Sequence, residues 1–300
     1  MAGISTMRWR RRGRRAFLLL SLAASLAAPM LHGPAVAQEK VAGGTPVKTG
    51  TMPFVAAIWA KQFPFAPQCV GTLIAPATVL TSASCAYDLY GQENLPAGQL
   101  AVSFPGRSGG IFDQRRLRVA RIARHPGYDP KRCLAGFGCP KDVAVLTLAS
   151  TPPGVKPVAL VGPDEVRFEN PGDRVTIAGW TGDTTNAPGA YMLTQGAMPL
   201  IEPRTCKTRY EQSELGADGY PPVRVDLTDI FCTYSEEVGP CWEELGAPSM
   251  VRQDGGWRQV GIVNGIGFCV AGKWPVVHTR LSDPETNDWI RRQARKGDRS

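Results

Sequence analysis

The chain contains 300 residues, of which 43% are hydrophobic and 20% are charged, a composition typical of a globular protein with a buried core. Its formal net charge is +8, but six arginines and no acidic residue lie within the first 37 residues. Without that segment, 28 basic residues face 26 acidic ones. This near balance excludes a general electrostatic attraction to nucleic acids or anionic membranes, so neither is an expected partner.

The first 37 residues have the three parts of an export signal. An arginine-rich start is followed by an apolar run at residues 17–28, and Ala35-Val36-Ala37 precedes Gln38. This order predicts cleavage after Ala37, with residues 38–40 as a short propeptide-like segment. A membrane anchor is the alternative, but the apolar run falls well short of the roughly 20 residues that span a bilayer. The mature protein is therefore expected outside the cytoplasm and off the membrane.

The route of export is suggested by a pair of arginines before the apolar run. The segment Arg14-Arg15-Ala16-Phe17-Leu18 resembles the twin-arginine export motif of bacteria. Ordinary basic signal starts also contain arginine pairs by chance, so the general secretory route stays open. Either route predicts a bacterial protein that is secreted to the periplasm or the extracellular space.

From Val41 onward, short apolar and β-branched runs alternate with Gly, Pro, Asn and Asp, a pattern typical of an all-β sandwich or barrel. A proline-rich stretch at residues 150–163 is the natural linker between two halves. Helical periodicity is strong only at residues 283–295, where Asp283-Pro284 opens the segment and basic residues close it. Residues 296–300 form a basic tail.

The eight cysteines all lie in the part of the chain that is expected to be exported. An even number of cysteines outside the cytosol predicts disulfides, but eight of them allow 105 connectivities. Metal binding is disfavoured because there is no CxxC pair and only His125 and His278 remain after signal removal. No metal or cofactor is therefore expected.

Several short motifs follow one another in a fixed order along the chain. They are Val41-Ala42-Gly43-Gly44, Cys69 to Ile74, Val79 to Cys85, His125-Pro126-Gly127-Tyr128, Asp142 to Leu146, Ala178-Gly179-Trp180, Cys241 to Pro248, Gly261-Ile262-Val263 and Pro275 to Arg280. In order and spacing they resemble the chymotrypsin and trypsin family of serine proteases from about residue 41 to residue 290. Each motif is weak alone, and their succession is what makes the resemblance specific.

The resemblance implies an all-β fold of two packed six-stranded antiparallel barrels, with the active cleft between them and a C-terminal α-helix. The first barrel is expected at about residues 41–150 and the second at about residues 164–282. The family pattern also implies the pairs Cys69 with Cys85, Cys206 with Cys232, and Cys241 with Cys269. Cys133 and Cys139 have no counterpart in the family and remain to pair with each other.

The residues at the family's catalytic positions do not fit acyl transfer. The chemistry requires a hydroxyl nucleophile, an imidazole, a carboxylate that orients it and backbone donors for the oxyanion. The resemblance places Asp142 at the carboxylate's position, but Ser84 at that of the imidazole and Leu245 at that of the nucleophile. Glu243 takes the place of a glycine whose N–H helps to hold the oxyanion. A leucine has no attacking atom, and a serine hydroxyl does not accept a proton near neutral pH as an imidazole does.

The neighbouring positions are altered too. Glu244 replaces the aspartate that pairs with the freed N-terminus in active members, so an ion pair with a processed Val41 remains open. The positions that line the specificity pocket hold Gly239, Asn264, Gly265, Ile266 and Val276. The branched side chains of Ile266 and Val276 are expected to fill that pocket.

The sequence therefore predicts a secreted pseudoprotease, not an enzyme, that acts by binding an unknown protein partner. One alternative is a serine-type hydrolase of the trypsin family that uses a non-standard site. Another is a structural or adhesive secreted domain. The sequence identifies neither the partner nor an oligomeric state.

Overall fold

The computed structural model describes most of the chain that follows the predicted export signal. The described residues are 41, 43–88, 93–106, 115–130, 138–183, 190–212, 227–241, 244–265 and 271–297. All of them belong to one compact unit, residues 37–300. The predicted signal segment, its cleavage site between Ala37 and Gln38, and residues 38–40 lie outside the described residues. Within these ranges, no helix has the length and apolar character needed to cross a membrane.

Six antiparallel strands of the first half close into a barrel, in the order β2-β3-β4-β7-β6-β5. The strands are β2 (Val55–Ala60), β3 (Cys69–Ala75), β4 (Thr78–Thr81), β5 (Leu100–Ser103), β6 (Leu117–Arg124) and β7 (Ala144–Leu148). Strand β2 is buried along its whole length. Alternate residues of a barrel strand point inward and outward, and β2 also contacts the second sheet, so both of its faces are covered.

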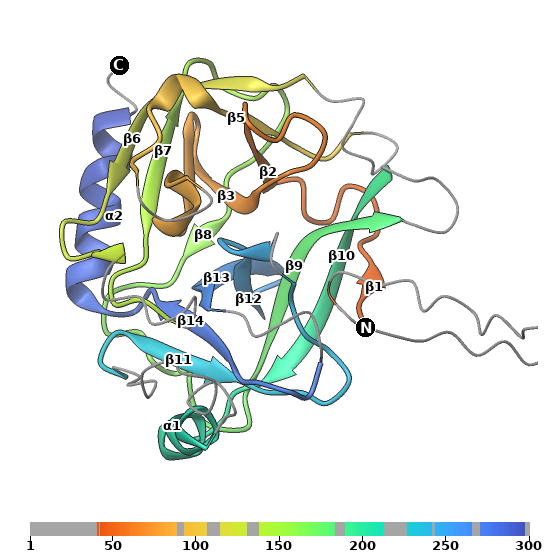
Figure 1. The fold of residues 1–300 in the computed structure, drawn as a ribbon, viewed down its shortest axis with the longest axis vertical. Coiled ribbons are helices and arrows are strands. Elements are labelled where there is room, and N and C mark those ends of the chain that lie inside the picture. Colours follow the sequence, from red (N-terminus) through yellow and green to blue (C-terminus); the bar gives the residue numbers. More distant parts are fainter. Residues whose placement is uncertain are drawn as a thin grey trace, which may run out of the picture. The chain divides into compact units, whose positions relative to one another are not determined.

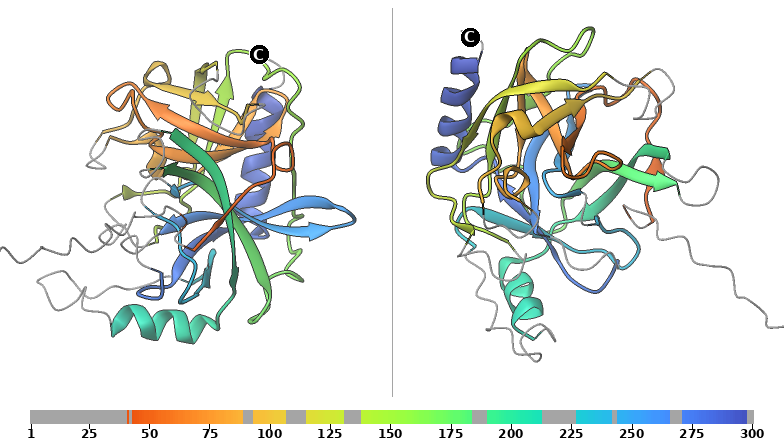
Figure 2. Two further views of the ribbon diagram at one scale, coloured as in Figure 1. Left: turned by 90° about the vertical axis from the view of Figure 1, so that its right-hand side faces the viewer. Right: turned by 45° about the horizontal axis from the view of Figure 1, so that its top comes forward.

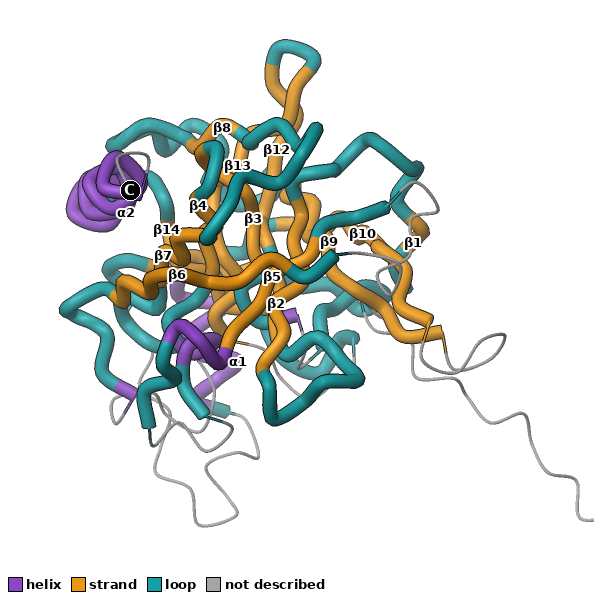
Figure 3. The backbone as a smooth tube through the Cα atoms, turned by 90° about the horizontal axis from the view of Figure 1, so that it is seen from above, coloured by secondary structure: helices purple, strands orange, loops and turns teal. Residues whose placement is uncertain are grey.

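The second sheet runs in the order β1-β10-β9-β12-β13-β14-β11, with β8 beside β13. Its strands are β1 (Thr45–Pro46), β8 (Ala159–Leu160), β9 (Arg174–Asp183), β10 (Ala190–Pro199), β11 (Ile230–Thr233), β12 (Pro248–Gln253), β13 (Gly256–Gly265) and β14 (Val276–Arg280). The β12–β13 hairpin extends away from the rest of this sheet (Figure 2, left; Figure 3).

The second sheet also closes on itself, through backbone hydrogen bonds between the end of β10 and β11. Ile201 N donates to Cys232 O at 3.0 Å, and Tyr234 N donates to Pro199 O at 3.1 Å. The strands from β10 through β11 therefore form a ring, to which β1 and β8 are added at the edges. This arrangement confirms the predicted fold class of two β-barrels with a C-terminal helix.

Two short strands differ from the predicted division of the chain. Strand β1 pairs with β10, with Thr45 opposite Gln195, whereas the sequence predicts residues 41–46 in the first barrel. Strand β8 lies inside the predicted linker and pairs in parallel with β13. A strand of two residues has no periodicity of its own, so only the tertiary partner decides where it pairs.

Two α-helices lie on the outside of the barrels (Figure 1). The predicted C-terminal helix is α2 (Pro284–Gly297), which packs against β7 and β4 of the first barrel. Helix α1 (Pro203–Glu211), beside β11, was not predicted. Its sequence is mostly polar and it buries only Cys206 and Tyr210, so it carries little helical periodicity, although Pro203 in the first turn is a favourable start.

Helix α2 is fixed at its N-terminal end by a cap and an ion pair. The Asp283 carboxylate accepts a hydrogen bond from Thr286 N at 2.9 Å and lies 2.6 Å from the Lys141 ammonium. The cap satisfies one of the free N–H groups at the helix start. The ion pair ties the helix to the loop that leads into Asp142.

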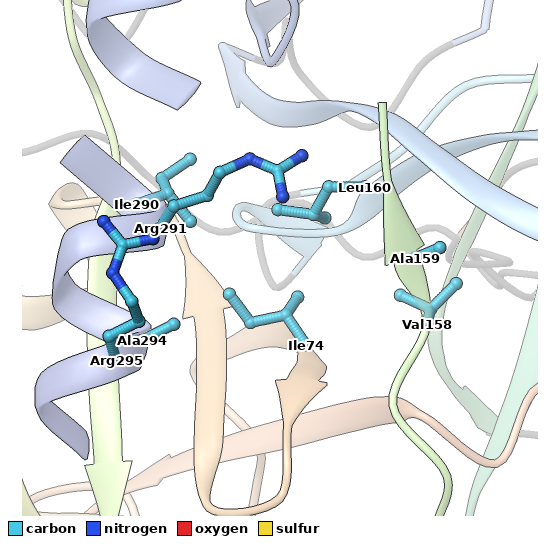
Figure 4. Close-up of a pocket in the computed structure, with 8 residues that line it drawn as sticks. All are labelled: Ile74, Val158, Ala159, Leu160, Ile290, Arg291, Ala294 and Arg295. Carbon is cyan, nitrogen blue, oxygen red and sulfur yellow. The ribbon is translucent and has the colours of Figure 1, made fainter. Parts of the chain in front are cut away.

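The docked α2 leaves a cavity of about 320 Å³ between the helix and β8. In Figure 4, Arg291 reaches from the helix toward Leu160, Arg295 stays beside the helix, and Ile74 lies between the helix and Val158. Arg291 is held by a hydrogen bond from its Nε to Asn287 Oδ1 at 2.6 Å.

Disulfides join several of these elements. Cys69 is bonded to Cys85, which links β3 to the 3₁₀ turn η1 (Ser84–Ala86), and Cys206 is bonded to Cys232, which links α1 to β11. Cys139 and Cys241 are also disulfide-bonded. Their predicted partners, Cys133 and Cys269, lie outside the described residues.

Candidate functional site

Ser84 and Asp142 form a hydrogen-bonded pair at the edge of the first barrel. Strand β4 ends just before Ser84, and Asp142 precedes β7, the strand beside β4. Asp142 Oδ1 accepts a hydrogen bond from Ser84 N at 2.8 Å, and Oδ2 accepts one from Ser84 Oγ at 3.0 Å. The pairing of β4 with β7 thus brings together two of the predicted site residues.

The environment of Asp142 changes the pH at which its carboxyl group loses a proton. The side chain is fully buried, and this burial raises the pKa of Asp142 to about 7. The two hydrogen bonds from Ser84 favour the carboxylate and therefore act in the opposite direction. At neutral pH the group is divided between its protonated and ionised forms.

A second serine extends this pair into a chain of hydroxyl groups. Ser82 Oγ lies 2.9 Å from Ser84 Oγ and 3.0 Å from Cys85 Sγ. Among the described side chains that hydrogen-bond to Ser84, none carries a basic nitrogen. The cluster can therefore orient hydroxyl protons, but it contains no imidazole that would accept one.

The histidines of the described chain are engaged elsewhere. His278 is fully buried, and its ring nitrogens lie 2.8 Å from Thr233 Oγ1 and 2.7 Å from Ser249 Oγ. Burial lowers the pKa of His278 to about 3, so its ring is neutral at physiological pH. His125 Nδ1 accepts a hydrogen bond from Gly127 N at 3.1 Å, and burial lowers its pKa as well. Both rings have structural contacts.

Leu245 lies on a segment that packs against the ends of β3 and β4. Its side chain is half-buried against the main core, and its carbonyl accepts a hydrogen bond from Val70 N at 2.9 Å. The next residue, Gly246, has φ +81°, and a Cβ there would lie 2.2 Å from both Thr81 Oγ1 and Val70 O. This position therefore requires glycine, and the close approach holds Leu245 near the Cys69–Cys85 disulfide. Glu243 lies outside the described residues.

Glu244 and Val41 are hydrogen-bonded to each other in the folded chain, whereas the predicted ion pair with a processed Val41 stays a prediction. Glu244 is fully buried, and its Oε2 accepts hydrogen bonds from Val41 N at 3.0 Å and from Cys241 N at 2.7 Å. In this uninterrupted chain the Val41 donor is a peptide N–H. Val41 has φ +45°, an unfavourable value for a β-branched residue, so the surrounding contacts hold its backbone under strain.

The residues predicted to line a specificity pocket are mostly packed into the interior. Asn264 Nδ2 donates to Thr279 Oγ1 at 2.8 Å and to Cys139 O at 3.2 Å, so its amide serves the fold. Val276 is 4% exposed and belongs to the main core. A Cβ on Gly265 would lie 2.4 Å from Gly138 N. Gly239 is buried, and Ile266 lies outside the described residues.

Two neighbours of Asp142 were not among the predicted site residues. Asp229 is a second buried carboxylate, which accepts a hydrogen bond from Lys141 N at 2.6 Å and contributes to the raised pKa of Asp142. Thr279 Oγ1 donates to Asp142 O at 3.0 Å. Both come from the second half of the chain, so only tertiary packing places them here. In the described part of the chain, no three His, Cys, Asp or Glu side chains are clustered to hold a metal.

Comparison with known proteins shows that the sequence of this chain is similar to those of proteases. The family profile described as Trypsin matches residues 41–290. A tryptase of Mus musculus is 26% identical over 280 residues, which cover 91% of this chain and 96% of the tryptase. Serine protease 28 of Mus musculus is 26% identical over 223 residues, 71% of this chain and 73% of that protein. Transmembrane protease serine 9 of Rattus norvegicus is 26% identical over 254 residues, which cover 83% of this chain but 21% of that longer protein.

Proposed function

The chain belongs to the trypsin family, and from this membership we propose that it is a catalytically inactive member, exported from the cell, that acts by binding a protein partner. The hydrogen bonding of Ser84 to Asp142 carries the proposal. In active members the carboxylate orients an imidazole, which takes a proton from the nucleophile. Here both carboxylate oxygens accept hydrogen bonds from Ser84 itself.

The expected loss of turnover rate is large enough to support an inactive protein over a slow enzyme. In triad enzymes, loss of the nucleophile or of the imidazole lowers turnover on the order of a million-fold. We assign Leu245 and Ser84 to those two positions. The rate that survives such a loss depends on the oxyanion donors, and we assign Glu243, with an acidic side chain, to one of their positions.

Protein binding is the proposed role because the framework is retained around this site. Both barrels close, the disulfides that join their elements are present, and the balance of charge after residue 37 favours no nucleic acid. A secreted domain with a maintained scaffold and no catalytic base is suited to recognition through its loops.

A serine hydrolase with a non-standard site is the second candidate. The curated relatives are named as proteases, and the Ser82–Ser84 hydroxyl chain leads to a carboxylate whose pKa burial raises to about 7. A carboxylate in this range can serve as a general base. In this alternative Ser84 is the nucleophile and Asp142 takes its proton.

A fluorophosphonate probe separates the two candidates. We expect the mature protein to remain unlabelled at every serine and to cleave no member of a broad peptide library. Labelling that disappears in Ser84→Ala but persists in Ser82→Ala would establish the hydrolase. Labelling of the double variant Ser84→His with Leu245→Ser, but of neither single variant, would support the assignment of these two positions.

To search for the partner, the mature protein is added to culture medium, and the complexes that it forms there are isolated. We expect a complex of fixed stoichiometry that survives gel filtration and forms again from its purified components. A protein that elutes alone at all concentrations, with no cross-linked product, would leave only a structural or adhesive role.

A further inference from the structure

Three basic side chains line one cavity on the outer face of the second sheet. This basic cavity has a volume of about 590 Å³. Its lining residues are Gly43, Thr45, Lys48, Thr51, Arg174, Thr176, Gln195, Gly196, Ala197, Val238, Arg252 and Trp257. The basic members are Lys48, Arg174 and Arg252, and the lining contains no acidic side chain.

The strand register explains why these side chains converge. On β9, Thr176 lies opposite Ala197 of β10. Arg252 lies opposite Trp257 across the β12–β13 hairpin that extends from the sheet (Figure 3). Residues opposite each other on neighbouring strands point to the same face, so five adjacent strands supply most of the lining. Lys48 and Thr51 join them from the turn after β1.

The two arginines are oriented by contacts within the protein. Arg174 Nη2 donates to Ala197 O at 2.7 Å. The Arg252 guanidinium lies 3.9 Å from the centre of the Trp257 ring. A guanidinium has five N–H donors, so each keeps most of its donors for another group.

The charges in the basic cavity are not neutralised by the described protein. Across the described residues, no carboxylate forms an ion pair with Lys48, Arg174 or Arg252. The nearest acidic residue in sequence to Arg174 is Asp173, whose Oδ2 accepts hydrogen bonds from Asn170 N and Nδ2 at 3.0 and 3.1 Å. Three unpaired cations in one concave site create a local positive potential, although the mature chain is nearly neutral.

We propose that the basic cavity binds a small organic ligand that carries a phosphate or sulfate group. Tetrahedral oxyanions match the forked donors of arginine, and the lysine adds a point charge. The threonine and glutamine side chains of the lining provide neutral hydrogen bonds. The volume lies within the range of small-molecule sites and exceeds what a bare ion fills, so the organic part lies against Trp257.

This binding site is separate from the Ser84–Asp142 pair and does not depend on whether the protein is catalytically active. Its floor includes Gly196, where a Cβ would lie 3.1 Å from Val41 Cγ1 and 2.3 Å from Val238 Cγ1. The ligand is therefore expected to bind beside the residues that enclose Val41, and not in the protease cleft.

Calorimetric titration of the mature protein tests the proposal with four probes: phenyl phosphate, phenyl sulfate, inorganic phosphate and phenol. We expect one of the two phenyl esters to bind best, inorganic phosphate to bind more weakly and phenol not to bind. The phenyl ester that binds more tightly shows whether the site takes a phosphate or a sulfate group. Affinity should fall as sodium chloride is raised, because the attraction is electrostatic.

Variants localise the binding. Arg174→Gln and Arg252→Gln should each weaken the best probe about tenfold or more, the usual effect of losing a charge-assisted hydrogen bond. Arg209→Gln is the matched control, because that exposed arginine also stacks on an aromatic ring, Tyr234, at 3.8 Å, but lies on α1. Both cavity arginines are exposed, so an unchanged thermal unfolding curve confirms that the variants fold. Absence of binding by all probes, or equal weakening by Arg209→Gln, would overturn the proposal.

Discussion

Asp142 and His278 titrate over overlapping pH ranges with opposite effects on stability. Burial raises the pKa of Asp142 from 3.8 to about 7, so between these values the folded state holds the extra proton and stability falls as pH rises. Burial lowers the pKa of His278 from 6.5 to about 3, so between these values the unfolded state holds the extra proton and stability rises with pH. Each effect has a slope of about 1.4 kcal/mol per pH unit, and the two nearly cancel between about pH 4 and pH 6.5.

Asp142→Asn should therefore expose the titration of His278. Relative to the unmodified protein, we expect the free energy of unfolding of this variant to rise by about 1.4 kcal/mol per pH unit between about pH 4.5 and pH 6. Urea unfolding at several pH values measures it. The matched variant His278→Gln should show the opposite slope, and parallel curves for all three proteins would contradict the assignment.

Gly179→Ala should be destabilising because the carboxylate of Glu244 occupies the space that a side chain needs. A Cβ at this position would lie 2.4 Å from Glu244 Oε1. Overpacking of this kind costs about 1–3 kcal/mol. Gly98→Ala is the control, since nothing lies within 4 Å of a Cβ there. Equal unfolding free energies for the two variants, measured in urea, would show that Glu244 moves aside freely.

At the residue scale, the motifs predicted some contacts and not others. Ser84 with Asp142 and Val41 with Glu244 belong to motifs whose order along the chain is informative, and the structure brings both pairs together. The buried Asp229 was missed, because an isolated aspartate gives no sign that the fold will bury it. Its position depends on a hydrogen bond to the backbone of Lys141, which sequence patterns do not describe.

At the element scale, the stability that α2 contributes depends more on the cap at its N-terminal end than on its exposed ion pairs. Asp283→Ala removes both the cap on Thr286 and the partly buried ion pair with Lys141, so we expect a loss of about 1–2 kcal/mol of stability. Glu285→Gln removes an ion pair from the same lysine, but the Glu285 side chain is 68% exposed, and such pairs contribute less than about 1 kcal/mol. Thermal unfolding of the two variants compares them, and a larger effect for Glu285→Gln would contradict the capping role.

The predictability of the elements follows from their length and amphipathic character. Helix α2 has an Asp-Pro start, a buried face and a basic end, so sequence preferences located it within two residues at each end. Helix α1 and the two-residue strands β1 and β8 have too few buried positions to set a period. Their conformation is decided by partners distant in the sequence.

For the molecule as a whole, the motif order was sufficient for the fold class, because the motifs lie on strands of the two barrels or directly beside them. It did not indicate the basic cavity. That cavity combines residues from five strands with Lys48 and other loop residues beside them, and the register of the second sheet brings the strand residues together.

The pairing of the first strand also has a consequence for the order of folding. The first barrel is built from a nearly continuous stretch, from β2 to β7, whereas Val41 bonds to Glu244 across 203 positions. Contacts between distant residues form late, because closing a long loop costs entropy before it is rewarded. Pulsed hydrogen exchange during refolding should protect the amides of β4 and β7 before that of Val47, which bonds to Leu193 O at 2.8 Å. Simultaneous protection would mean that the barrels assemble together; delayed protection of Val47 would mean that the segment around β1 joins the second sheet after the first barrel has formed.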